Sequence, residues 1–329
     1  MKKYLVTGGS GFIGSALVKR LLKEGYAVRV LDNNSRGNLR RLEDVFDQIE
    51  FLEGDICDQG VVSNACKGVD GVFHLAYING TEFFYTKPDL ILEVGVKGMM
   101  NVLDACREHQ IKELILASSS EVYQKAPVIP TDETTPLIVP DPLNPRYSYG
   151  GGKIISELLT LNYSKYFDKV LIFRPHNVYG PDMGWEHVIP QFALRMKDLA
   201  EKNTASTIDF PIQGTGEETR SFIYIDDFCD GLIVMLHKGE HKNIYHIGTL
   251  EEVNIKQVAQ EIGKCLNKTV TIVPGELAKG GTERRCPDIG KMKKLGFNPT
   301  TSLAKGISIT TKWYVENAHL KNKKVSEVK

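Results

Sequence analysis

The stretch Gly8-Gly9-Ser10-Gly11-Phe12-Ile13-Gly14 decides the fold, because it joins a short apolar strand pattern at Tyr4–Thr7 to a helical pattern at Ser15–Gly25. Three of its four glycines, Gly8, Gly11 and Gly14, have separate roles. The first allows a tight turn, the second lets the backbone approach a pyrophosphate, and the third opens the helix and lets it pack closely on the strand. A strand, a glycine loop and a helix in this order predict a dinucleotide-binding unit.

Two carboxylates follow the next strand patterns. Asp32 ends the second strand, eighteen residues beyond Gly14, where it can accept hydrogen bonds from the adenosine ribose hydroxyls. It would also repel a 2′-phosphate, so the cofactor expected is NAD, although nearby Arg36 could bind such a phosphate. Asp55 can meet the adenine amino group, or remain a solvated loop residue. The residues expected to contact NAD are Gly8, Gly11, Phe12, Ile13, Gly14, Asp32, Asn33, Asp55, Ile56, Leu75, Ala76, Tyr149 and Lys153.

Short β-branched runs alternate with helix-length segments through the first 175 residues, which predicts an α/β fold, a Rossmann doubly wound parallel sheet. Prolines and glycines then loosen the rhythm and predict a smaller C-terminal substrate-binding lobe. The expected division is an NAD-binding domain of residues 1–175 to which 211–245 return, a lobe of 176–210 and 246–320, and a polar tail of 321–329. The strands are expected at 4–7, 27–31, 49–52, 71–75, 113–118 and 169–173, and a late helix at 303 to about 318.

Composition excludes several classes of protein. The 41 basic and 41 acidic residues cancel, which argues against a general nucleic-acid or acidic-membrane binder. No apolar run approaches the roughly 18 residues of a membrane span, and the N-terminus leaves no room for a signal-peptide core. The six cysteines form no CxxC pair or Cys/His cluster. We therefore expect no metal site, reduced thiols and a cytoplasmic protein.

Tyr149 and Lys153 are the only Tyr and Lys in the chain at this spacing of four residues. On a helix they share a face, so the ammonium would lower the phenol pKa from its ordinary value of about 10 and let Tyr149 act as a base. An exposed helix pair is the alternative interpretation. The three glycines between them make a poor helix start.

Polar residues follow the strand predicted at 113–118, at the carboxyl edge where open α/β sheets place their ligands. The run reads Ser118-Ser119-Ser120-Glu121-Val122-Tyr123. A hydroxyl of Ser119 or Ser120 could hold a substrate oxygen beside Tyr149.

Seven motifs, in their order along the chain, resemble the extended short-chain dehydrogenase/reductases that act on nucleotide sugars. The resemblance implies a tightly held NAD that takes hydride from C4 of a nucleoside-diphosphate hexose, while Tyr149 takes the hydroxyl proton and Ser119 or Ser120 steadies that oxygen. The motifs are Gly8–Gly14, Asp32, His74-Leu75-Ala76, Ser118–Tyr123, Tyr149 with Lys153, Arg174–Pro181 and Thr219–Asp227.

The resemblance leaves the fate of the 4-keto intermediate open, and Glu121 bears on that choice. Family dehydratases carry Asp then Glu after an active-site Thr, whereas Ser119-Ser120-Glu121 lacks the Asp. Decarboxylases carry Thr-Ser-Glu there, and epimerases often have no carboxylate. We expect a 4-epimerase or close relative with Glu121 as a possible second acid or base. The alternatives are a UDP-uronic acid decarboxylase, a net 4-oxidase or 4,6-dehydratase, and, in a different class, a non-catalytic NAD-binding regulator.

The resemblance also implies substrate contacts and a partner. Arg220 would bind the diphosphate of the substrate. Arg285 would reach the diphosphate in epimerases and the active site in decarboxylases. Asn177 would line the nucleotide pocket. A homodimer is expected through the helices around residues 91–109 and 149–166.

Two departures from that family pattern stand out. Many relatives read Asn-Val-x-Gly-Thr where this chain reads Gly95-Val96-Lys97-Gly98-Met99. The loop at 77–85, which begins with Tyr77, is bulkier and more aromatic than a plain His-Leu-Ala-Ala loop. Either the support of the catalytic centre differs in this chain, or the reaction does.

Overall fold

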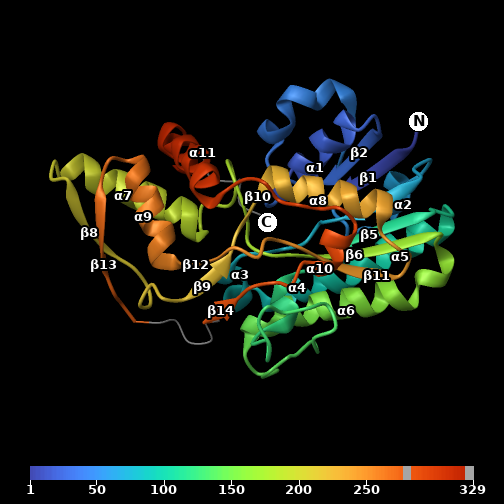
Figure 1. Ribbon diagram of the computed structural model, residues 1–329. Helices are drawn as coiled ribbons and strands as arrows, with labels where there is room; N and C mark the ends of the chain where they lie inside the picture. The colour runs from blue at the N-terminus through green and yellow to red at the C-terminus, as the bar shows by residue number, and fades with distance from the viewer. Residues whose placement is uncertain (277–282, 323–329) are drawn as a thin grey trace.

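A seven-stranded parallel sheet organises the computed structural model, which describes residues 1–276 and 283–322 (Figure 1). The strand order is β11-β6-β5-β4-β1-β2-β3, so the chain winds outward in both directions from β1 and β4. All six strands predicted from the sequence are present, and β11 adds a seventh. The strands are β1 (Lys3–Thr7), β2 (Ala27–Asp32), β3 (Ile49–Glu53), β4 (Gly71–His74), β5 (Glu113–Ala117), β6 (Lys169–Pro175) and β11 (Asn243–Ile247).

Both faces of the sheet are buried, as alternation along β1 shows. Tyr4 and Val6 belong to one core cluster and Leu5 to another. The first cluster lies under α1 (Phe12–Lys23) and α8 (Ile225–Lys238), and the second under α2 (Gln59–Cys66) and α5 (Gly98–Glu108). Parallel sheets need such a cover on both faces, and the apolar strand patterns of the sequence reflect it.

The first helix differs slightly from its prediction. It begins at Phe12 rather than at Gly14, so Gly14 lies in its first turn. Gly25 follows the helix with a φ of +83°, in the left-handed region that glycine favours at helix ends.

The smaller lobe is built on α7 (Val188–Lys202), α9 (Ile255–Cys265) and α11 (Leu303–Glu316), which pack on one another beside the sheet domain (Figure 1). Three small sheets accompany them. They pair β8 (Thr207–Pro211) with β13 (Thr269–Val273), β7 (Val178–Tyr179) with β10 (Ile223–Tyr224), and β9 (Thr219–Ser221) with both β12 (Glu252–Asn254) and β14 (Arg284–Arg285).

The remaining helices of the described chain are α6, which has 15 residues, and several shorter ones. Two of them were not predicted from the sequence. Much of the segment 77–85, expected to be a loop, belongs to α3, and a π-helical turn, η2, precedes α5. They are η1 (Leu39–Gln48), α3 (Thr81–Thr86), α4 (Pro88–Leu92), η2 (Glu93–Lys97), η3 (Ser120–Tyr123), η4 (Pro145–Tyr147), α6 (Ser148–Asn162), η5 (Ser164–Tyr166), α10 (Gly290–Lys294) and η6 (Ala318–Asn322). Within residues 1–276 and 283–322, no helix is long and apolar enough to cross a membrane.

Candidate active site

The glycine loop forms a cradle that side chains would fill. Gly8 has a φ of +74°, and a Cβ there would lie 2.8 Å from the Ala76 backbone nitrogen. A Cβ on Gly14 would overlap the Gly8 carbonyl oxygen. Gly11 precedes α1, and no side chain in the described part of the chain caps that helix. The first-turn N–H groups and the bare backbone therefore fit a pyrophosphate.

The predicted adenosine contacts lie at the ends of β2 and β3. The Asp32 carboxylate accepts the Ser10 and Asn34 backbone N–H groups, each at 2.9 Å, and so ties β2 to the glycine loop. Each oxygen keeps a lone pair for a ribose hydroxyl. The Asn33 Nδ2 donates to the half-buried Asp55 carboxylate at 2.8 Å, so Asp55 is connected to the end of β2.

The remaining cofactor residues support the same surface. The Thr7 hydroxyl accepts the backbone N–H groups of Leu75 and Ala76, each at 3.2 Å, so this hydroxyl holds the segment after β4 against the glycine loop. Ile56 is buried. Arg36, which could have met a 2′-phosphate, pairs with Glu186 instead.

Tyr149 and Lys153 are both buried on α6, with 7% and 3% of their surfaces exposed, which rejects the exposed helix pair. The Lys153 Nζ donates to the Ala117 carbonyl at the end of β5 at 2.8 Å. It lies 3.8 Å from the centre of the Tyr77 ring and 5.8 Å from that of Tyr149. Burial lowers the pKa of Lys153 to about 7, against the opposing charge of Glu157.

The phenol pKa differs from the sequence prediction. Burial raises the pKa of Tyr149 to about 12, a hydrogen bond with Ser119 works in the opposite direction, and the Glu121 carboxylate adds to the rise. The sequence predicted a lowered phenol pKa, which was wrong for the protein alone, because desolvation of the phenolate dominates.

The three serines after β5 have different surroundings. Ser118 donates to Glu157 in a buried network. Ser119 accepts the Glu121 backbone N–H at 3.1 Å, so its own proton is available to Tyr149 or to a substrate oxygen. Ser120 is buried at the start of η3. Of the two hydroxyls that the sequence left open, Ser119 is the one beside the phenol.

At two of the three positions between Tyr149 and Lys153, a side chain larger than glycine would clash with neighbouring residues. A Cβ on Gly150 would lie 3.0 Å from the Glu121 carbonyl oxygen and would overlap the Gln124 side chain. A Cβ on Gly152 would overlap the Tyr77 hydroxyl. Close approach of neighbouring segments therefore explains a helix start that propensity disfavours.

Positive charge surrounds Glu121. The Arg285 Nη1 donates to its carboxylate at 2.6 Å, and the charges of Arg146 and Arg220 add to the effect. Burial acts to raise the pKa of Glu121, but these guanidinium groups outweigh it and hold the pKa below its ordinary value. Burial, followed by the charge of Arg285, lowers the pKa of Arg220 to about 10. Such an excess of guanidinium groups suits a diphosphate or a carboxylate.

Arg146 is a site residue that the sequence patterns did not reveal, although it lies only three positions before Tyr149. Its Nε is buried, with no hydrogen-bond partner among the described residues. Asn177, predicted to line the nucleotide pocket, donates to the Ser221 carbonyl at 2.9 Å and so holds the segment that carries Arg220.

Comparison with known proteins shows which family has this fold. The model of the NAD dependent epimerase/dehydratase family matches residues 4–248. The chain belongs to that family. Its fold and its use of NAD are those that the sequence predicted, since solved neighbours include NAD complexes of two dehydratases and an epimerase.

Several relatives are similar to this chain over nearly its whole length. A UDP-N-acetyl-alpha-D-glucosaminuronate decarboxylase from Bacillus cytotoxicus is 32% identical over 96% of this chain and 98% of its own. The crystal structure of the dTDP-glucose 4,6-dehydratase DesIV from Streptomyces venezuelae is 30% identical, has a TM-score of 0.84, and covers 97% of this chain and 98% of its own. UDP-glucose 4-epimerase from Thermotoga maritima is 27% identical, with a TM-score of 0.84 and coverage of 96% and 99%.

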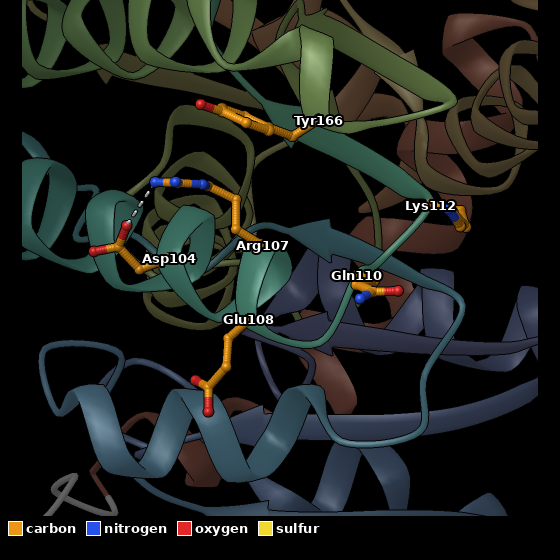
Figure 2. A pocket seen from close by; sticks show the side chains of 6 residues that line it. All are labelled: Asp104, Arg107, Glu108, Gln110, Lys112 and Tyr166. Atoms are coloured by element: carbon orange, nitrogen blue, oxygen red, sulfur yellow. Dashed lines mark ion pairs between the residues drawn. The ribbon is translucent and has the colours of Figure 1, made fainter.

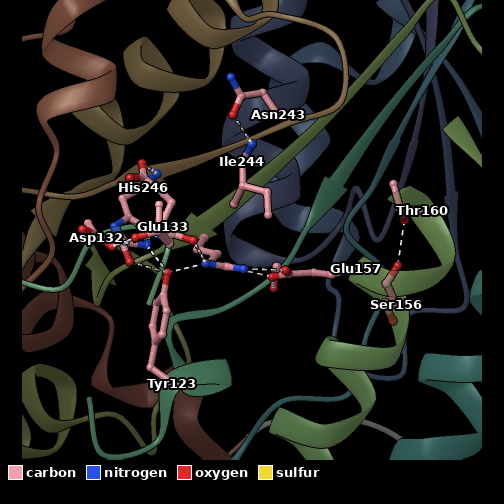
Figure 3. A network of polar contacts seen from close by, with 12 residues as sticks. Tyr123, Asp132, Glu133, Ser156, Glu157, Thr160, Asn243, Ile244 and His246 are labelled. Carbon is pink, nitrogen blue, oxygen red and sulfur yellow. Dashed lines mark hydrogen bonds and ion pairs between the residues drawn. The ribbon is translucent and has the colours of Figure 1, made fainter. Parts of the chain in front are cut away.

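A buried ion pair lies next to the candidate site. Arg174 binds Glu157 at 2.6 Å, and both side chains are 2% exposed. The Tyr123 hydroxyl contacts Arg174 and lies 2.6 Å from the His246 Nε2, so the network links α6, η3 and β11 (Figure 3). Glu157 was also missed, though it follows Lys153 by four residues on the same helix face.

A surface hollow lies away from this site. It has a volume of about 590 Å³ and lies at the amino end of β5, opposite the serines, where Arg107 extends between Asp104 and Tyr166 (Figure 2). Its other lining residues are Glu108, Gln110 and Lys112. Across residues 1–276 and 283–322, no group of His, Cys, Asp and Glu could hold a metal ion.

Proposed function

We propose that the protein oxidises C4 of a nucleoside-diphosphate sugar with NAD. The observation that carries this proposal is the buried set of Tyr149, Ser119 and Lys153 at the carboxyl edge of the sheet, beside the glycine cradle. The relatives named above act on UDP- and dTDP-linked sugars, and they supply the substrate class.

The residues divide the first step among them. Ser119, whose proton is available, would hold the C4 oxygen, and Tyr149 would accept the proton of the C4 hydroxyl. Lys153, fixed on the Ala117 carbonyl, would stabilise the phenolate that this transfer requires. The glycine cradle and Asp32 would hold NAD, which would supply a hydride acceptor and a positive charge that favours the phenolate.

We propose 4-epimerisation as the second step. It needs only the return of hydride to the opposite face of the ketone, so the groups of the first step suffice when run in reverse. Arg220 and Asn177 would hold the diphosphate end of the substrate while the sugar turns.

A second candidate is decarboxylation of a uronic acid, and the contact between Glu121 and Arg285 favours it. A guanidinium group in this position could bind a substrate carboxylate, and a 4-ketone beside that carboxylate would accept the electrons released with carbon dioxide. The decarboxylase from Bacillus cytotoxicus is consistent with this candidate.

The assembly and location are also proposals. Leu92, Ile155, Leu158 and Tyr166 expose apolar surface on the neighbouring segments α4, α6 and η5, which would suit a homodimer contact. Met99 and Val102, by contrast, are fully buried in the core. All six cysteines are free thiols, in keeping with the cytoplasm.

One assay tests the whole proposal. The protein is incubated with NAD and a panel of UDP-, GDP- and dTDP-sugars that includes uronic acids, while absorbance reports NADH and mass spectrometry reports products. An unchanged mass with an inverted C4 centre is the expected result, and loss of carbon dioxide would select the second candidate. Absence of turnover with every sugar would reject the enzyme and leave the NAD-binding regulator.

A further inference from the structure

Tyr77 makes the contacts that the proposed function leaves unexplained. It follows β4, and its phenol enters a space between η2 and α6 where a Cβ on either Gly95 or Gly152 would overlap the hydroxyl. That hydroxyl is buried and has no hydrogen-bond partner among the described residues. The two departures noted in the sequence, the glycine at 95 and the aromatic residue at 77, are therefore parts of one packing arrangement.

The face of the Tyr77 ring lies against Lys153. The ammonium nitrogen is 3.8 Å from the ring centre, well within the range of a cation–π interaction, and burial removes the water that would weaken it. The same ring meets Tyr149 edge to face, at 5.2 Å between centres and 86° between planes. Phe84 stacks on the Tyr149 ring at 5.1 Å. Tyr77 thus touches both members of the pair that the proposed reaction needs.

Few other charges face Lys153. On α6 these are Tyr149 and Glu157, and Glu157 is already paired with Arg174. On β4 it is His74, whose pKa burial lowers to about 3, so the imidazole stays neutral. Burial also raises the pKa of Tyr77, so its hydroxyl stays protonated. The Glu157 charge, the Ala117 carbonyl and the Tyr77 ring are therefore the groups that oppose the cost of burying the ammonium ion, and Ala117 and Tyr77 lie in direct contact with it.

We propose that Tyr77 is a positioning residue for Lys153: its ring face holds the ammonium beside Tyr149, and the lack of side chains at Gly95 and Gly152 makes room for its phenol. The role of Lys153 in the reaction rests on the proposed function. The interaction between the Tyr77 ring and the Lys153 ammonium does not rest on the proposed function, and it can be measured without substrate.

The first test titrates Lys153 in the protein alone. In protein labelled with 15N at lysine Nζ, the Lys153 signal is assigned by its loss in Lys153→Met and followed with pH. Tyr77→Met keeps an apolar side chain but removes the ring, and we expect the Lys153 pKa to fall by about one unit. Tyr77→Phe keeps the ring and should leave the Lys153 pKa unchanged. A Tyr77→Met protein with the wild-type value, or a higher one, would overturn the proposal; Tyr77→Leu repeats the test should Tyr77→Met fail to fold.

The second test examines the fit with glycine. Gly95→Ala should lower the melting temperature of the wild type, because the new methyl group meets the Tyr77 phenol. In a Tyr77→Leu background, Gly95→Ala should lower the melting temperature by less than half as much. Equal losses in the two backgrounds would show that the phenol is not seated against Gly95.

Turnover separates this inference from the proposed function. If a nucleotide sugar reacts, the pH profile of kcat/KM for Tyr77→Met should lose activity at lower pH on its alkaline side than the Tyr77→Phe profile, since protonated Lys153 is lost earlier. Coincident profiles would contradict the positioning role. If no sugar reacts, the proposed function fails, while the titration still decides whether the ring holds the ammonium.

Discussion

Arg285 and Glu121 are 164 positions apart in the sequence, and 2.6 Å separates the guanidinium nitrogen from the carboxylate oxygen in the structure. The pair joins β14 of the smaller lobe to η3, which follows the central strand β5, and it lies near Tyr149, whose pKa the Glu121 charge raises. Its position makes Glu121 the residue that separates the two candidate reactions.

Glu121→Gln keeps the shape of the side chain and removes its charge. If the protein is a 4-epimerase, kcat should stay within about tenfold of wild type, because no step requires a carboxylate. If Glu121 acts as an acid or base in decarboxylation, kcat should fall by about 10² to 10⁴. Product mass spectrometry under single-turnover conditions measures both outcomes, and Glu316→Gln, at an exposed carboxylate, is the control.

Acid should also weaken the Glu121 contact. The folded-state pKa of Glu121 is depressed, so its stabilising effect is present above the ordinary value near 4.5 and is lost as pH falls through the folded value. Between about pH 5 and pH 3, the wild type should therefore lose more free energy of unfolding than Glu121→Gln does. Urea titrations of both proteins at several pH values measure the difference, and parallel curves would show that the pair does not contribute.

Tyr149→Phe removes the proposed base and leaves the ring packed between Tyr77 and Phe84. We expect C4 oxidation to fall by about 10² to 10⁴ while NAD stays bound, since the glycine cradle is untouched. Stopped-flow absorbance of NADH and calorimetry with NAD measure the two properties. Near-normal NADH formation would show that another group takes the proton.

The serines provide a matched pair of variants. Ser119→Ala should reduce kcat by about 10²-fold, because it removes the hydroxyl beside Tyr149. Ser120→Ala, one residue along, should stay within a few-fold of wild type. Steady-state kinetics of the two variants measure the contrast, and the opposite ranking would assign the substrate oxygen to Ser120.

The lowered pKa of Lys153 should make the stability of the protein depend on pH. Its pKa of about 7 lies below the ordinary lysine value, so the folded protein releases a proton between about pH 7 and pH 10 that the unfolded chain retains. The wild type should therefore gain up to about 1.4 kcal/mol of unfolding free energy per pH unit in this window relative to Lys153→Met. Urea unfolding at pH 7, 8 and 9 without NAD measures this trend. Lys312→Met, at an exposed lysine, should show no such trend.

The sequence predicted what depends on local pattern. The six strands, the turn at Gly8 and the helix end at Gly25 follow from alternation and from glycine conformations, which neighbouring residues determine. The spacing of Tyr149 and Lys153 predicted a shared helix face for the same reason. Arg146 and Glu157 escaped notice because a charged residue carries no local sign of burial.

By itself, the sequence determined a parallel sheet with a dinucleotide cradle and the types of residue at its edge, because glycine turns and strand periods are local properties. Only the tertiary structure decided which residues meet there. Of Ser119 and Ser120, it placed Ser119 beside the phenol, and burial raised the phenol pKa that spacing alone predicted to fall. It also seated Tyr77 between Gly95 and Gly152 against Lys153. Burial and close packing bring together residues from distant segments, and no local pattern encodes them.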